Sequence, residues 1–505
     1  MNEIFSAKIV VFNIQGGSGL LAILNTEQAA KFGIKEGDKI SLIRKNEEYI
    51  VDVVLSNDYI QANEIGVTHE LLNEYPIQEG DNVLVSYVQH NPLSMQAIRK
   101  KMLGKKISDE EIDAIIEDIQ NNKLSDLVLA YYTATSFFYQ TDDHELAYTT
   151  KATAYTGDMY RFPGVVAGKY CIGGVPGNET TMIIIPLLAS LGITVPKTFS
   201  KSITSPAATG ECVNVLMDIS FKKQEIIRMV DKNGACLVWN EGLNLAPAND
   251  RIIKVSSPLG MEPYARMISS IMAKNYAMGI NHCLIDIPMG PTAKVNSRED
   301  AKRVAQHFKN VGEALDVKMD VQITQADQPV GNGIGAALQV REVLRILQQH
   351  EKRPRDLEEK AIFLSARLIL LCGMRKTMKE AEKLAKETLV SGEAWKKMQE
   401  IIKTQRGENP HIRSEELELG KITHEVKADH DYQIIGVDMK YLNMMVRSLG
   451  APSEYKAGIY LYKKIGDKVR KGEIIYTMYS TSENKMKRAK EMLAEKHFYS
   501  YKELK

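Results

Sequence analysis

The sequence has few of the features that mark secreted, membrane or zinc-binding proteins. Five of its 505 residues are cysteine, and no two are spaced as Cys-x-x-Cys. Disulfide frameworks and zinc sites need paired or closely spaced cysteines, so we expect reduced thiols and no metal site. The longest apolar stretch, Thr181–Val195, contains Pro186 and Gly192 and is shorter than the roughly 20 residues of a membrane span. The first residues include Glu3 and no basic segment, so we expect no signal peptide and a cytoplasmic, soluble protein.

The chain also lacks an excess of charge of either sign. It has 65 basic and 64 acidic residues, so it has no bulk attraction for nucleic acid or an anionic membrane. Any anion that it binds must be captured by a local cluster. The contents of 44% hydrophobic and 26% charged residues are typical of globular proteins, and 505 residues are too many for one core.

The hydrophobic pattern divides the chain into four segments. Residues 1–88 contain short alternating runs with glycine turns, which predict a β domain. Residues 89–157 have a helical period and include a capping box at Ser108 and Glu111, and we expect residues near 247–280 to complete this domain. Residues 158–410 alternate strands and helices, and residues 411–505 predict an α+β domain. The expected fold class is α/β with a separate all-α domain and a mixed or parallel sheet flanked by helices.

Two details refine this prediction. In the central segment we expect strands at 165–170, 235–239, 282–288 and 317–324, and helices at about 180–192, 297–315 and 335–349. In the N-terminal segment, Lys35–Leu42 and Gln78–Val85 share the pattern Glu-Gly-Asp followed by a strand. This likeness indicates either a repeated unit or two unrelated Gly-Asp turns.

The first segment with chemical potential is Gly168–Thr181, GKYCIGGVPGNETT. A strand leads into a glycine loop, and a helix begins directly after it. Glycines let backbone N–H groups approach an anion, and a helix N-terminus offers free donors and partial positive charge. Lys169 adds a full charge, and Thr180 and Thr181 add hydroxyls. The segment indicates an anion site, although a plain glycine-rich turn is the simpler alternative.

A second segment, Pro196–Thr209, is predicted to be rich in turns and contains two lysines, Lys197 and Lys201. Hydroxyls and amides bind phosphate or sugar oxygens without a metal. Its six hydroxyl residues are Thr198, Ser200, Ser202, Thr204, Ser205 and Thr209. A solvated loop is the alternative, but two such segments separated by a single helix favour a binding site.

Other candidates have weaker local signals. Lys294 follows a strand in a Gly-Pro turn, where open α/β sheets bind ligands, but it could equally be a surface lysine. The glycine-rich run that begins at Gln328 is expected to pack beside the site. Ser270 and Lys274 are four residues apart and therefore share a helix face. Glu262 has no local motif, and a surface position is its default.

In this order, the segments resemble the family of thymidine and pyrimidine-nucleoside phosphorylases, and most of all its long branch, which includes the AMP phosphorylases. The loop KYCIGGVPGN is similar to the family's Lys-His-Ser/Cys-x-Gly-Gly-Val loop. PKTFSKSITSPAAT is similar to its Ser-Arg-Ala-Ile-Thr-Ser segment, and NLAPANDRII and IDIPMGPTAKV also match. The resemblance covers nearly the whole chain.

The resemblance implies a pentosyltransferase in which inorganic phosphate is a co-substrate, with no metal or organic cofactor, and a homodimer or higher homo-oligomer. It implies catalytic roles for Glu262, as the proton donor, and for Tyr170. It implies phosphate binding by Lys169, Gly174, Thr180 and Thr181. The implied substrate-binding residues are Ser200, Lys201, Ser202, Ile203, Thr204, Ser205, Thr209, Ser270, Lys274 and Lys294.

Four residues depart from the family's pattern. Gly168 and Tyr170 stand where the family commonly has aspartate and histidine, Lys201 replaces arginine, and Glu262 replaces aspartate. Three functions stay open. The favoured one is phosphorolysis of a nucleoside 5′-monophosphate to a base and ribose 1,5-bisphosphate. The alternatives are phosphorolysis of thymidine to thymine and 2-deoxyribose 1-phosphate, and a nucleotide-binding protein with impaired catalysis.

Overall fold

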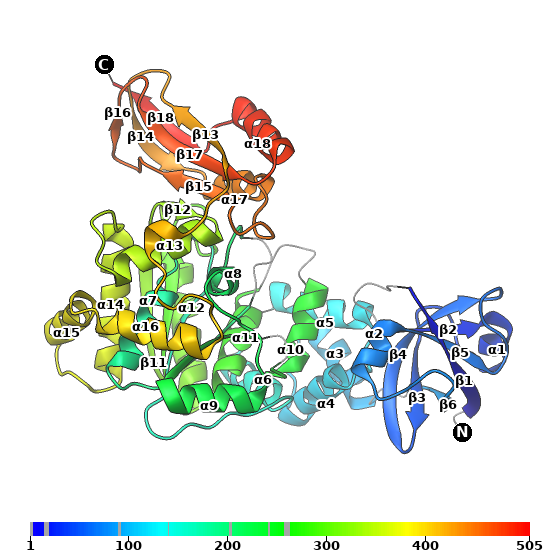
Figure 1. Ribbon diagram of the computed structural model, residues 1–505. Helices are drawn as coiled ribbons and strands as arrows, with labels where there is room; N and C mark the ends of the chain where they lie inside the picture. The colour runs from blue at the N-terminus through cyan, green and yellow to red at the C-terminus, as the bar shows by residue number, and fades with distance from the viewer. Residues whose placement is uncertain are drawn as a thin grey trace. The chain divides into compact units, whose positions relative to one another are not determined.

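The computed structural model describes residues 4–14, 20–88, 92–139, 141–200, 205–240, 243–256 and 263–504. The chain forms two compact units (Figure 1). The first consists of residues 1–156 and 247–263, and the second of residues 157–246 and 264–505. All the candidate site residues that the structure describes belong to the second unit.

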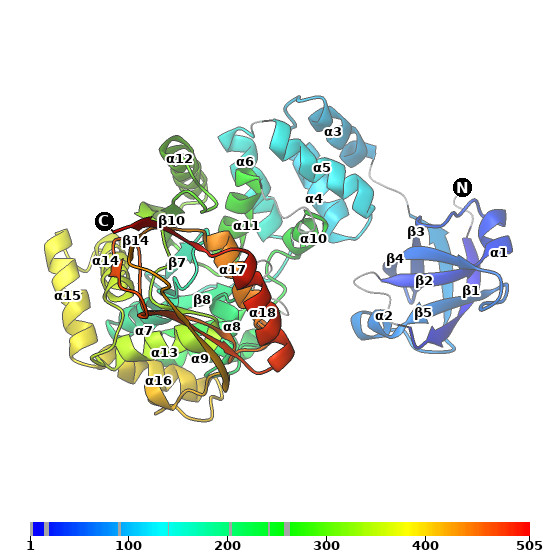
Figure 2. The ribbon, with the colours of Figure 1, turned by 90° about the horizontal axis from the view of Figure 1, so that it is seen from above.

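The N-terminal segment is a closed barrel, visible as the blue strands in Figure 2. Its strand order is β1-β5-β2-β4-β3-β6, and the short helices α1 and α2 follow β2 and β5. The elements are β1 (Ile4–Phe12), β2 (Leu21–Asn25), α1 (Thr26–Lys31), β3 (Lys39–Arg44), β4 (Glu47–Ser56), β5 (Glu64–Thr68), α2 (His69–Glu74) and β6 (Asn82–Tyr87).

The barrel is an internal repeat. β1 runs parallel to β5 and antiparallel to β6, and β4 has the same relation to β2 and β3. The two Gly-Asp turns also match, because Asp38 Oδ2 accepts from the N–H of Lys35 at 2.8 Å and Asp81 Oδ2 from that of Gln78 at 2.7 Å. The repeat interpretation is therefore confirmed, and it extends over β1-β2-α1-β3 and β4-β5-α2-β6.

The remainder of the first unit is helical, and buried isoleucines of α4 form much of its core. The predicted capping box of Ser108 and Glu111 is present at the start of α4. α10 packs on α4 and α5, but α11 (Tyr264–Ala277) belongs to the second unit, which differs from the expectation for residues 247–280. The helices are α3 (Pro92–Met102), α4 (Asp109–Gln120), α5 (Asp126–Phe138), α6 (Asp143–Ala154) and α10 (Pro247–Ser256).

The second unit is built on parallel strands. β11, β10 and β7 form one sheet, β8 and β9 form another, and a bridge between Val166 and Thr194 joins the two. The four expected strands are confirmed. β8 was not expected, because its residues belong mostly to the stretch Pro196–Thr209, which the sequence indicated to be rich in turns. The strands are β7 (Ala167–Cys171), β8 (Val195–Phe199), β9 (Ala235–Trp239), β10 (His282–Met289) and β11 (Lys318–Gln325).

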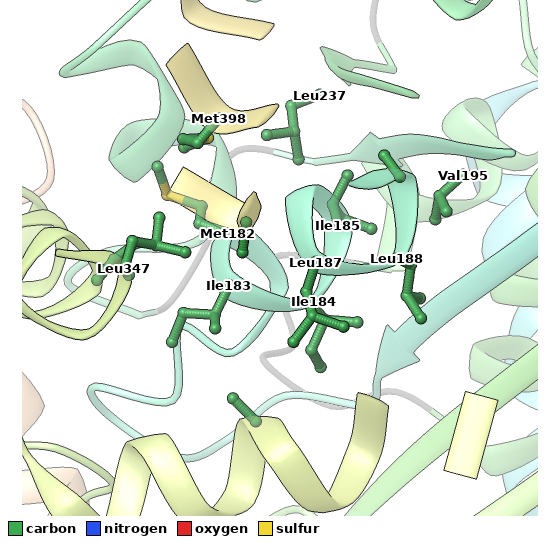
Figure 3. Packing of buried hydrophobic residues seen from close by; sticks show 14 of the residues in the cluster. Met182, Ile183, Ile184, Ile185, Leu187, Leu188, Val195, Leu237, Leu347 and Met398 are labelled. Carbon is green, nitrogen blue, oxygen red and sulfur yellow. The ribbon is translucent and has the colours of Figure 1, made fainter. Parts of the chain in front are cut away.

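Helix α7 (Thr181–Ser190) lies in the core of this unit, and all its residues except Ser190 are buried. Figure 3 shows its Met182, Ile184 and Leu188 among residues of other elements, with Met182 near Met398 of α16. Because α7 begins at the glycine loop, this packing fixes the position of that loop. The other helices are α8 (Thr209–Asn214), α9 (Lys223–Asn233), α12 (Arg298–Ala314), α13 (Ala336–Leu347), α14 (Arg355–Leu371), α15 (Met378–Val390) and α16 (Glu393–Thr404).

The C-terminal segment forms two small antiparallel sheets with the orders β12-β15-β17-β13 and β16-β14-β18. β12 comes from the preceding segment and pairs with β15, so it joins that segment to the C-terminal segment (Figure 1). The elements are β12 (Gly333–Ile334), η2 (Ser414–Glu416), β13 (Ile422–Lys427), β14 (Tyr432–Val437), α17 (Met439–Ser448), β15 (Gly458–Leu461), β16 (Lys468–Val469), β17 (Ile474–Ser480), α18 (Glu483–Glu495) and β18 (Tyr499–Glu503). Among the described residues, no helix has the length and apolar character needed to cross a membrane.

We expect Ile184→Ala in α7 to lower the free energy of unfolding by about 2–5 kcal/mol, because it removes buried methyl groups and leaves a cavity. Val390→Ala is the control, since Val390 is 60% exposed and its change should be within about 0.5 kcal/mol. Urea unfolding followed by circular dichroism measures both. Equal midpoints for the two variants would show that α7 is not part of the core.

Candidate active site

Three strands that precede candidate residues end at one edge of the parallel sheets. The register pairs Cys171 of β7 with Asp286 of β10, so both strands end at the same edge. β8 runs parallel to β9 and lies beside β7. The glycine loop after β7, the hydroxyl segment after β8 and the turn after β10 therefore leave the sheets together. This is the edge at which α/β proteins bind ligands.

The glycine loop has the backbone that the sequence predicts. Gly173, Gly174 and Gly177 have φ values of 83°, 93° and 74°, which residues with a side chain rarely adopt. A Cβ on Gly177 would lie 2.3 Å from the carbonyl oxygen of Val330, and the N–H of Val330 donates to Pro176. The run that follows Gln328 thus packs beside the site, as expected.

Lys169 and Thr180 lie beneath this loop and are joined to each other. The Lys169 Nζ donates to Thr180 Oγ1 at 2.8 Å, and the two residues are 1% and 0% exposed. Thr181, the first residue of α7, is also buried. The loop is braced from inside by Cys171, whose Sγ accepts from the N–H of Gly173. A lysine, hydroxyls and a helix N-terminus are therefore brought together.

Lys294 contacts the same loop from the turn after β10. A Cβ on Gly174 would lie 3.2 Å from the backbone N of Lys294 and 3.3 Å from its Cγ. The turn is closed by a hydrogen bond from the N–H of Gly290 to Val295, and the Lys294 side chain is exposed. The structure thus places Lys294 against the glycine loop, with its side chain exposed.

The hydroxyl segment begins as the strand β8 and not as a turn. Its described members are tied to neighbouring elements: Ser200 accepts from Asn240 Nδ2 at 3.2 Å, and the Ser205 carbonyl accepts from Arg447 at 3.4 Å. Thr209, at the start of α8, donates to Glu179. Lys201, Ser202, Ile203 and Thr204 lie outside the described residues.

Tyr170 faces β8. Its hydroxyl is 3.2 Å from Thr198 Oγ1, and the Lys197 Nζ lies 3.2 Å from its ring centroid. Burial raises the pKa of Tyr170 well above its ordinary value. The phenol therefore stays neutral near pH 7, so it can donate a hydrogen bond but cannot serve as a ready proton carrier.

Glu179 is the residue that sequence reasoning missed. It is 3% exposed, and its two carboxylate oxygens lie 3.2 and 3.1 Å from Thr209 Oγ1. Burial raises its pKa to about 7, and Lys169 partly opposes that rise. The only sequence signal was an acidic residue inside a presumed anion loop. Through its bond to Thr209, Glu179 joins the glycine loop to the hydroxyl segment.

The remaining candidates lie on α11 or outside the described residues. Lys274 is 6% exposed and Ser270 is half-buried, and their spacing of four places them on one face of α11. Glu262 lies outside the described residues. Among the residues that are described, no group of three or more His, Cys, Asp or Glu side chains is placed to hold a metal ion.

The structure explains one departure from the family's pattern. A Cβ on Gly168 would lie 2.8 Å from Cδ1 and 2.9 Å from Cγ2 of Ile280. An aspartate at this position would therefore overlap with Ile280 unless that side chain moved. Glycine at 168 and isoleucine at 280 fit each other.

Two family models match the chain: "Glycosyl transferase family, a/b domain" over residues 168–395 and "Pyrimidine nucleoside phosphorylase C-terminal domain" over residues 434–500. The chain is 38% identical to the AMP phosphorylase of Thermococcus kodakarensis, over 94% of this chain and 93% of that protein. The chain belongs to the AMP phosphorylase family. A second member, the AMP phosphorylase of Methanocaldococcus jannaschii, is 36% identical over 93% of this chain and 92% of its own.

Family membership makes this protein a pentosyltransferase of the phosphorylase type. A solved structure, the anthranilate phosphoribosyltransferase of Thermus thermophilus, superposes with a TM-score of 0.53 at 16% identity. It covers 62% of this chain and 99% of its own, and it shows the α/β fold. The expected family and fold class are thus confirmed.

We expect Gly174→Ala to raise the KM for the substrates more than Gly173→Ala does. Both glycines have positive φ, so both variants carry a similar backbone strain of about 1–2 kcal/mol. Only at Gly174 does the added Cβ press on Lys294, because nothing lies within 4 Å of the Gly173 position. Steady-state kinetics compares the two, and equal effects would mean that the approach of Lys294 to the loop is unimportant.

Proposed function

We propose that this protein catalyses the phosphorolysis of AMP, in which inorganic phosphate displaces adenine and leaves ribose 1,5-bisphosphate. The names of the relatives support this substrate, since they are AMP phosphorylases aligned over nearly their whole length. One feature of the site carries the proposal: it has cations at two places along one glycine loop. Lys169 is buried beneath the loop, and Lys294 contacts Gly174 from the turn after β10.

Two cationic places suit a reaction that brings two phosphate groups together. Lys169, Gly174, Thr180 and Thr181 hold the attacking phosphate in this proposal. Lys294 neutralises the 5′-phosphate of the nucleotide, and the segment from Ser200 to Ser205 with Thr209 lines the space for that phosphate and the ribose. Ser270 and Lys274 face the base.

The chemistry needs binding, orientation and one proton. A phosphate oxygen forms a bond to C1′ as the bond from C1′ to the base nitrogen breaks, and the electron pair of that bond moves to the base. The transition state has oxocarbenium character, and a proton from Glu262 neutralises the departing base. Tyr170 donates a hydrogen bond, as its raised pKa allows. The proposal includes no metal or organic cofactor.

We also propose a homodimer in the cytoplasm. The exposed apolar residues of α5 and its neighbours support the dimer, because large clusters of exposed apolar side chains often mark protein–protein interfaces. Leu127, Tyr131 and Phe138 lie on one face of α5, and Phe138 is 79% exposed. Tyr139 bonds to the carbonyl of Met102, which brings the exposed Leu103 close. We call these residues the α5 apolar patch.

We expect phosphate-dependent release of adenine from AMP, with adenosine and thymidine turned over far more slowly. The assay follows free base by chromatography for AMP, CMP, UMP, dTMP, adenosine and thymidine, with and without phosphate. Lys294→Met should raise the KM for AMP roughly 10- to 100-fold, since a charged hydrogen bond contributes about 1.5–3 kcal/mol. Lys302→Met, at an exposed lysine of α12, is the control.

Other outcomes of this assay select the alternatives. Equal turnover of thymidine and dTMP would remove the reason for a nucleotide substrate and favour thymidine phosphorolysis. Tight binding of AMP without release of base would favour a nucleotide-binding protein that has lost catalysis.

We expect Phe138→Asp, combined with Leu127→Asp, to convert the dimer into monomers, because each places a charge in the α5 apolar patch. Sedimentation velocity measures the mass of the wild type and the variant. Tyr59→Asp, at a residue that is 76% exposed on the barrel, is the control. A wild type that sediments as a 56.6 kDa monomer would contradict the proposal.

A further inference from the structure

Lys197 is a buried lysine that has no ion pair with the part of the chain that the structure describes. It lies on β8 and is 5% exposed. Its Nζ forms no ion pair with a described residue and instead contacts the Tyr170 ring, 3.2 Å from the ring centroid. A buried ammonium group is destabilised by several kcal/mol unless a negative charge or hydrogen bonds compensate it. At this position the amine is therefore either neutral or compensated by an anion.

The groups that surround Lys197 contain little negative charge. β7 contributes Lys169, Tyr170 and Cys171, β9 contributes Cys236 and β10 contributes Cys283. Burial raises the pKa of each of these three thiols, so they are neutral near pH 7. Among these neighbours of Lys197, only Glu179 has a carboxyl group that can carry a negative charge. Glu211 and Cys212 of α8 lie near Glu179.

Glu179 cannot compensate two lysines by itself. It faces both Lys169 and Lys197, and it also accepts hydrogen bonds from Thr209 and from the backbone N–H of Met182. Burial, followed by the charge of Lys169, holds the pKa of Lys197 well below its ordinary value. The buried carboxylate Asp286 also acts on Lys169, but it forms an ion pair with Lys360 at 3.1 Å. Three lysines therefore share two carboxylates, and the arrangement lacks one negative charge whenever all three lysines are protonated.

We propose that Lys197 is a further anion-binding residue of the phosphate site, and that Glu179 balances the lysine charge until phosphate binds. This inference rests on the proposed function, because it takes the glycine loop as the phosphate site. Phosphate brings the missing negative charge between Lys169 and Lys197. It also reaches Thr209, which in this proposal lies between the attacking phosphate and the ribose. The hydroxyl of Thr209 then turns from Glu179 to a phosphate oxygen.

Proton uptake follows from this arrangement. An anion beside Lys197 and Glu179 favours the protonated form of each, so the pair gains a proton as the anion binds. Anion affinity should therefore decrease as the pH rises through neutrality. Either group can take up this proton, because the charge of each affects the pKa of the other.

Calorimetric titration tests the inference with sulfate as the probe. Sulfate has no proton to gain or lose near pH 7, so any proton taken up belongs to the protein. The experiment compares the full chain in two buffers of different ionisation enthalpy, and phosphate is titrated in parallel. We expect the wild type to take up a fraction of one proton, to about one at most.

Four variants define the outcome. Lys197→Met should weaken sulfate and phosphate binding roughly 10- to 100-fold. Lys197→Arg keeps the charge and should keep most of the affinity. Glu179→Gln should reduce the proton uptake while the protein still binds the anion. Lys309→Met, at an exposed lysine of α12, should match the wild type in both measurements.

Unchanged affinity and proton uptake in Lys197→Met would overturn the inference. If Lys197→Met does not fold, as judged by circular dichroism, wild-type proton uptake in Glu179→Gln together with lost binding in Lys197→Arg would overturn it instead. The proposed substrate is tested separately. Absence of AMP turnover in a wild type that binds sulfate with proton uptake would contradict the substrate and leave Lys197 in the anion site.

Discussion

Charge balance in a buried space is the constraint on which this site depends. Lys169 and Lys197 are each at most 5% exposed, and Glu179 is the carboxylate that faces them both. Burial penalises each charge separately, so the three groups are stable only as a set. The set is held in place because α7, which follows Glu179, lies in the core, and because β7 and β8 lie side by side. The same packing that stabilises the second unit thus holds the two lysines and the carboxylate beside the glycine loop, where we propose that an oxyanion binds.

Local patterns were sufficient to predict the fold class and the position of the glycine loop. Short apolar runs separated by helical segments predicted β7, β9, β10 and β11, and these strands are parallel as expected. The convergence of the glycine loop with Lys294 followed from that topology, since parallel strands deliver their carboxyl ends to one edge. The capping residue Ser108 correctly marked the start of α4, because an N-cap bond involves only residues three apart.

Long-range pairings could not be predicted in this way. The residues of β8, VPKTF, include proline, lysine and threonine, so they resembled a turn until their pairing with β9 was known. Glu179 is bonded to a residue 30 positions away, and Lys197 is buried by a ring from another strand. The fit of Gly168 to Ile280 depends on residues 112 positions apart, which no local pattern contains. The sequence therefore indicates a candidate site, but only the structure shows which charges face one another there.

A crystal structure of the protein with inorganic phosphate tests the central claim most directly. The account predicts density for phosphate within hydrogen-bonding distance of the Lys169 Nζ, the Gly174 N–H and the Thr209 hydroxyl, with the Lys197 Nζ also in contact. Phosphate bound at another place, or a glycine loop whose N–H groups are turned away from these side chains, would contradict it.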